Sequence, residues 1–136
     1  MEGLRLSYAT TDVNDHTSTG AGDNSVIKAT YAYGPVTVGF SEMEHDENNT
    51  SGAGDITMTS YNISYTVSDD ISVSYGTEES NKGSATTDLE VSGITASYTS
   101  GGMTLSLTMQ ELENGNWGTG SEEDLDFYAL GASFAF

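Results

Sequence analysis

Hydrophobic and polar residues alternate along most of this chain, and the pattern is clearest in its last nine residues, YALGASFAF. Apolar residues, all large except Ala132, occupy every second position from Tyr128 to Phe136, and small residues fill the positions between them. Successive side chains of an extended strand point to opposite faces. The segment therefore predicts a strand with one large apolar face and one face of small residues.

Seven further segments alternate in the same way, and we expect eight strands, at residues 2–11, 25–33, 35–44, 57–67, 71–79, 90–99, 102–111 and 124–136. Tight turns are expected at 34–35, 68–70 and 100–102, and longer polar loops at 12–24, 45–56, 80–89 and 112–123. Short and long connections thus alternate, which is typical of an up-and-down transmembrane β-barrel in an outer membrane. A β-sandwich has no reason to keep this order. The sequence predicts an all-β, antiparallel fold.

The polar face of these strands is rich in Ser and Thr, and we expect it to face a water-filled pore. The candidate pore-lining residues are Arg5, Ser7, Lys28, Thr30, Ser41, Ser60, Asn62, Ser72, Ser74, Glu78, Thr104, Ser106, Thr108 and Gln110. Arg5 and Lys28 share this face on neighbouring strands, so they would set part of the field in the pore. The alternative is that each only balances a nearby carboxylate on the wall.

Aromatic residues on the apolar face sort to the two ends of the strands, which predicts the aromatic girdles of a membrane barrel. The set near the long loops is Tyr8, Phe40, Tyr75 and Tyr128, and the set near the tight turns is Tyr33, Tyr65, Tyr98, Phe134 and Phe136. The core of a soluble protein gives no cause for aromatic residues to sort by strand end. The apolar face is therefore expected to contact lipid.

Composition narrows the possible functions. The 136 residues contain 21 Asp and Glu but only 3 Lys and Arg, for a formal net charge of −18. Nucleic acid is excluded as a partner, because phosphate binding needs a basic surface. The acidic residues concentrate in the expected long loops. They would bind divalent cations that bridge to lipopolysaccharide, attract cations toward the pore, or form no more than a solvated surface.

Nothing in the sequence indicates an enzyme, a cofactor or a metal site. His16 and His45 fall in different loops without a spaced partner, and no catalytic triad or phosphate-binding loop is present. The GAGD strings at 20–23 and 52–55 have no fixed period and read as loop sequence. Trp117, in the last long loop, is expected to contact lipid headgroups or a partner.

Taken together, the chain resembles the C-terminal half of a Gram-negative general porin. The alternation that ends on a terminal aromatic resembles the signal that the barrel-assembly machinery recognises, here Tyr128, Leu130, Ala132, Phe134 and Phe136. The resemblance implies passive diffusion of small hydrophilic solutes and ions through a trimer of roughly 16-stranded barrels. It also implies a location in the outer membrane of a Gram-negative bacterium, in contact with lipid and lipopolysaccharide.

Residues 1–136 would then form one porin-type β-barrel domain, the C-terminal portion of a larger barrel. The opening residues MEGLRLSYATT lack the basic and apolar regions of a signal peptide. One alternative is a closed eight-stranded barrel that serves as a structural anchor or adhesin. Side chains fill the interior of such a barrel, and the small residues here favour a wider pore. A weaker alternative is a secreted acidic β-sandwich that binds calcium or glycans.

Overall fold

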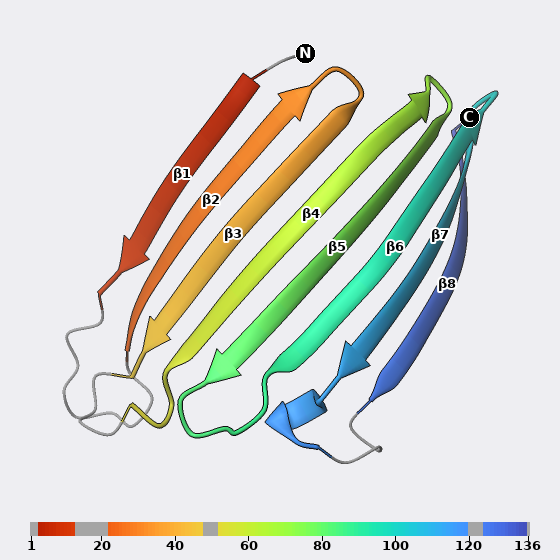
Figure 1. The fold of residues 1–136 in the computed structure, drawn as a ribbon. Coiled ribbons are helices and arrows are strands. Elements are labelled where there is room, and N and C mark those ends of the chain that lie inside the picture. The colour runs from red at the N-terminus through yellow and green to blue at the C-terminus, as the bar shows by residue number, and fades with distance from the viewer. Residues whose placement is uncertain (1–2, 13–21, 48–51, 120–123, 136) are drawn as a thin grey trace.

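The computed structural model describes residues 3–12, 22–47, 52–119 and 124–135. Eight strands form a single antiparallel sheet in which each strand pairs with its neighbour in sequence. The strands are β1 (Gly3–Thr11), β2 (Asp23–Tyr33), β3 (Val36–Asp46), β4 (Ile56–Ser68), β5 (Ile71–Lys82), β6 (Leu89–Ser100), β7 (Met103–Glu113) and β8 (Leu125–Phe134). Figure 1 shows a curved sheet with the tight turns at its upper end and the long loops at its lower end.

All eight predicted strands are confirmed, with differences only at their ends. The largest is in β5, which continues to Lys82, three residues beyond the prediction. The apolar alternation stops earlier because both faces of the sheet become polar near the long loops, whereas the main-chain ladder continues. A short 3₁₀ turn, η1 (Gly115–Trp117), lies in the last long loop. Within the described ranges, no helix is long and apolar enough to cross a membrane.

Two of the three tight turns, at 34–35 and 101–102, depend on backbone conformations that favour glycine. Gly101 and Gly102 have φ values of +57° and +84°, and Gly34 has a φ of +56°. Two successive residues with positive φ give a turn whose twist matches that of the flanking strands. The single proline of the chain, Pro35, sits beside Gly34 in a turn, where no ladder hydrogen bond is lost.

The sheet has no hydrophobic core, since no apolar side chain is buried among the residues that the structure describes. Leu130 is 81% exposed and Leu6 is 71% exposed. A continuous apolar face of this kind is rare on a soluble monomer and marks a surface that something else covers. No second sheet packs on it in the described part of the chain, so the β-sandwich alternative is wrong. The closed eight-stranded barrel finds no support either, because β1 and β8 form opposite edges.

The last long loop is fastened to the rim of β5. The indole Nε1 of Trp117 donates a hydrogen bond of 2.8 Å to the carbonyl oxygen of Ser80, which is only 3% exposed. The ammonium of Lys82 lies 4.9 Å from the centre of the same ring. The indole is thus held by the sheet itself, and its contact with lipid headgroups or a partner stays a prediction. The side-chain amide of Asn114 adds a hydrogen bond of 2.9 Å to the carbonyl oxygen of Asp88.

The contact between Lys82 and Trp117 can be tested directly, because the chain has a single Trp. Lys82→Met removes the ammonium but keeps a side chain of similar length. We expect it to raise the acrylamide quenching constant of Trp117 about twofold in the chain refolded in detergent, because an exposed cation–π contact contributes about 0.5–1 kcal/mol. Lys28→Met, the same charge change on β2, is the control. Equal quenching of all three proteins would show that this contact does not hold the loop.

Candidate functional site

Cross-strand pairing carries the polar face across the sheet in continuous rows. In one row Ser7 pairs with Lys28, Lys28 with Ser41, Ser41 with Ser60, and Ser60 with Glu78. The next rows toward the tight turns continue in the same way, and all of the predicted pore-lining residues share this face. The remaining members are Arg5, Thr30, Asn62, Ser72, Ser74, Thr104, Ser106, Thr108 and Gln110. We call this surface the polar face.

Hydroxyl groups on the polar face bond across neighbouring strands. Ser72 and Ser97 are joined by a hydrogen bond of 2.7 Å, and Thr99 and Thr104 by one of 3.0 Å. Each hydroxyl can donate and accept, so such pairs satisfy one another and still leave capacity for water. Where these pairs lie, the wall of the sheet is polar without being charged.

Arg5 and Lys28 are exposed on the polar face, and neither makes an ion pair with a described residue. Their cross-strand neighbours are hydroxyl residues: Arg5 lies opposite Thr30, and Lys28 lies between Ser7 and Ser41. The alternative that each only balances a carboxylate therefore finds no support. Both cations are available to a solute or ion near this face.

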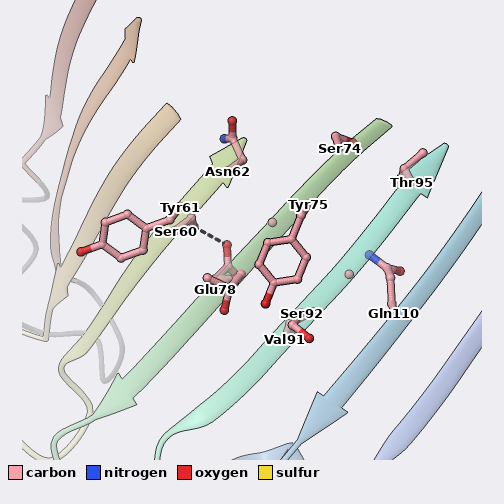
Figure 2. Close-up of a pocket in the computed structure, with 13 residues that line it drawn as sticks. Ser60, Tyr61, Asn62, Ser74, Tyr75, Glu78, Val91, Ser92, Thr95 and Gln110 are labelled. Carbon is pink, nitrogen blue, oxygen red and sulfur yellow. Dashed lines mark hydrogen bonds between the residues drawn. The ribbon is translucent and has the colours of Figure 1, made fainter. Parts of the chain in front are cut away.

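A cavity of about 570 Å³ opens on the polar face across β4, β5, β6 and β7 (Figure 2). Five of the predicted residues line it: Ser60, Asn62, Ser74, Glu78 and Gln110. The hydroxyl of Ser60 donates a hydrogen bond of 2.7 Å to Oε2 of Glu78, which fixes the carboxylate against the wall. Glu78 is the one ionisable side chain on the polar side of this lining.

The candidate pore-lining residues did not include Gly76, Gly93 and Thr95, which are among the other residues that line the cavity. Their positions in the alternating pattern of each strand place them on the polar face. Only the register between strands shows that they lie between the predicted residues. Gly76 pairs with Asn62 on one side and with Gly93 on the other. Thr95 pairs with Ser74.

The opposite, apolar face carries the predicted girdle residues, except that Phe136 lies outside the described residues. Near the long loops the aromatic residues step toward the tight turns along the sheet: Phe40 lies one row closer to the tight turns than Tyr8, and Tyr75 lies one row closer than Phe40. Strands of a membrane barrel tilt by about 35–45°, so rows perpendicular to the strands are inclined to the membrane. A level girdle must therefore change rows along the sheet, as Tyr8, Phe40 and Tyr75 do; Tyr128 lies in the same row as Tyr75.

Tyr61 lies beside these aromatic residues on the apolar face and was not among the predicted girdle members. It lies opposite Phe40, with the ring centres 5.4 Å apart and the planes inclined by 46°. This tilted arrangement is a favourable one for two aromatic rings. The alternation already placed Tyr61 on the apolar face. Its level along the strand became clear only from its pairing with Phe40.

Between the apolar band and the long loops, the outward-facing positions of the strands are rich in Asp and Glu. We call this set the acidic belt; its members are Glu42, Glu44, Glu79, Glu90, Glu111, Glu113 and Asp126. Glu90 lies directly opposite both Glu79 and Glu113, and like charges in such positions destabilise a sheet. Part of the acidity expected in loops thus lies on strand ends. Within the described ranges, no group of three or more His, Asp or Glu is arranged to hold a metal ion.

Of the remaining sequence motifs, His45 and the GAGD string at 52–55 make contacts at the long-loop end, whereas His16 and residues 20–21 lie outside the described residues. In the GAGD string at 52–55, Asp55 accepts a hydrogen bond of 3.0 Å from the main-chain N–H of Glu47 through Oδ1. Its carbonyl oxygen accepts one of 2.9 Å from Gly83, which ties two long connections together. Nδ1 of His45 lies 2.9 Å from Oδ1 of Asn24 on the adjacent strand.

These features agree with the comparisons with known proteins. The sequence model of a family described as Gram-negative porin matches residues 2–136. A solved structure titled as porin refined at 1.8 Å resolution matches with a TM-score of 0.71 and 16% identity. The match covers 96% of this chain and 47% of that one, so the chain spans about half the length of the solved porin. A search of the curated proteins found no match. The chain therefore belongs to the Gram-negative porin family, and it is an outer-membrane protein of the transmembrane β-barrel type.

Proposed function

We propose that the chain forms part of the wall of a channel through which small hydrophilic solutes and ions diffuse passively across the outer membrane. The observation that carries this proposal is a single-layer sheet with one continuous polar face and one exposed apolar face. Lipid can cover the apolar face, and water can fill the space beside the polar one. No step of such a mechanism needs a cofactor or covalent chemistry.

We further propose that these eight strands are one part of a wider barrel of about sixteen strands. The sheet leaves β1 and β8 as edges, and its match to the solved porin spans about half of that protein. Unpaired strand edges cannot remain in a lipid environment. The trimer and the recognition of the C-terminal strand by the assembly machinery come from the resemblance to porins and stay predictions.

The acidic belt supports a second part of the proposal, contact with lipopolysaccharide through divalent cations. Carboxylates are preferred ligands of Mg²⁺ and Ca²⁺. The belt faces outward on the long-loop side of the apolar band, where the phosphate groups of lipopolysaccharide would lie. Bridging cations would offset the repulsion between Glu90 and its two acidic neighbours.

Conduction is tested in planar bilayers with the full-length gene product. We expect the parent to show steady ion conductance. Replacing both Arg5 and Lys28 by Gln removes two cations from the wall. We expect this variant to shift the reversal potential in a KCl gradient toward the K⁺ equilibrium potential. The control replaces Thr59 and Thr77, on the outward face, by Glu, which changes the net charge equally. Absence of conductance in folded protein would overturn the channel, and equal shifts would overturn the pore-lining role of the two cations.

The orientation of the two faces is tested on β8, where Leu130 lies between Tyr128 and Phe134 on the outward face. We expect Leu130→Lys to lower the free energy of unfolding in lipid vesicles by about 2–4 kcal/mol, the cost of a lysine on the lipid face near mid-membrane. Ala129→Lys, one residue away on the polar face, should have a much smaller effect. A larger loss for Ala129→Lys would mean that the faces are reversed.

The contact with lipopolysaccharide is tested with Glu90→Gln, which removes the charge shared by two like-charge pairs. In EDTA this variant should be about 0.5–1 kcal/mol more stable than the parent, because each such pair is unfavourable by a few tenths of a kcal/mol or more. It should also lose part of the stabilisation that Mg²⁺ and lipopolysaccharide give the parent. The control is Glu78→Gln on the polar face. If Mg²⁺ stabilises parent and Glu90→Gln equally, the belt does not bind the cation.

A further inference from the structure

A row of glycines and amides crosses the polar face at one level of the sheet. Cross-strand pairing joins Gly39 to Asn62, Asn62 to Gly76, Gly76 to Gly93, and Gly93 to Gln110. All of these except Gly39 line the cavity on the polar face. The row therefore forms a band of small residues and two amide side chains across the cavity.

Two of the glycines make room for the amides to lie along the wall. A Cβ atom at Gly39 would be 2.6 Å from Nδ2 of Asn62, so the Asn62 amide occupies the space above that glycine. A Cβ at Gly93 would be 2.9 Å from Cγ of Gln110, so the Gln110 side chain lies across Gly93. Both contacts are closer than real Cβ atoms show. The amides thus stay against the sheet and do not fill the cavity.

Gly76 differs from both, because the space above it is open. A Cβ there would meet only the carbonyl oxygen of Tyr61 at 3.5 Å and Cβ of Asn62 at 3.7 Å, which are ordinary contacts. Bare backbone at Gly76 is therefore the floor of the cavity, and such a glycine lets a ligand approach the main chain closely. Figure 2 shows Asn62, Glu78, Ser74, Thr95 and Gln110 placed around this region.

The groups around the floor favour a solute that donates hydrogen bonds and carries positive charge. Glu78 accepts the Ser60 hydroxyl at Oε2, and its Oε1 has no hydrogen-bond partner within the described ranges. Ser74, Thr95 and the Gln110 amide can each donate and accept. Lys28 lies on β2, three strands from β5 and thus about 14 Å away at 4.7–4.9 Å per strand. At that separation its charge is largely screened at physiological salt.

We infer that the cavity over Gly76 is a binding site for small hydroxylated solutes that carry a primary ammonium group. The ammonium group donates to Oε1 of Glu78, the hydroxyls bond to Gln110, Ser74 and Thr95, and the body of the solute lies over the backbone of Gly76. This inference rests on the proposed function, since a permeating solute meets the site only if the polar face lines the channel. It adds a preference among solutes that diffusion alone does not provide.

The probe for this site is glucosamine, with glucose as the uncharged comparison. Binding is measured by equilibrium titration, followed by saturation-transfer NMR, on the full-length gene product in lipid nanodiscs. We expect glucosamine to bind more tightly than glucose. Glu78→Gln should weaken glucosamine binding about tenfold, the usual scale for a hydrogen bond to a charged group, and should leave glucose binding unchanged. Equal glucosamine affinity in parent and Glu78→Gln would overturn the role of the carboxylate.

The floor is tested separately with Gly76→Val, which the sheet has room to accept and which fills the open space with a residue suited to strands. It should abolish saturable binding of both sugars, whereas Ala32→Val, on the polar face of β2 and outside the cavity, should not. Retained binding in Gly76→Val would overturn the site. Conductance in KCl is recorded for every variant: a parent that conducts but does not bind glucosamine refutes this inference alone, and a parent that does not conduct refutes the proposed function.

Discussion

Main-chain hydrogen bonding between neighbouring strands is the interaction on which the rest of this structure depends. No apolar side chain is buried among the described residues, so side-chain packing cannot hold the strands together as it does in a soluble domain. Each strand is instead fixed by its ladder to the next, from β1 to β8. In lipid an unpaired backbone group costs several kcal/mol. Pairing is therefore compulsory, and the two free edges are the observation that supports the proposal of a larger barrel.

The tilt of the strands explains why features of the two faces follow inclined lines on the sheet. The row that contains Leu6 and Phe40 on the apolar side of the sheet reaches Glu111 and Asp126 at β7 and β8. The same row is thus apolar at one edge and acidic at the other. Because rows in a tilted sheet are inclined to the membrane plane, a level boundary between lipid and water must cross them. The girdle and the acidic belt follow the same boundary.

The sequence predicted the elements of the fold well, because strand periodicity and turn residues are local properties of the chain. Alternation identified all eight strands and assigned faces, and glycines marked turns such as Gly101–Gly102. The sequence did not show which residues lie side by side, because that depends on register between strands. The level of Tyr61 beside the girdle was missed for this reason, as were Gly76 and Gly93 in the site. The contacts of Trp117 with Ser80 and Lys82 were not foreseen, because these residues are more than thirty positions away in the chain.

Register also changes the meaning of the large negative charge. The chain carries a formal net charge of −18, which suggests a cation-attracting pore if the charge is taken as uniform. On the described strands, however, the polar face carries Arg5, Lys28 and Lys82 against the single carboxylate of Glu78, and the acidic belt faces outward. A wall charge acts on an ion only within about a Debye length. Under the proposed function, these few charges are what this part of the wall presents to an ion, because most acidic residues of the described strands lie on the outward face.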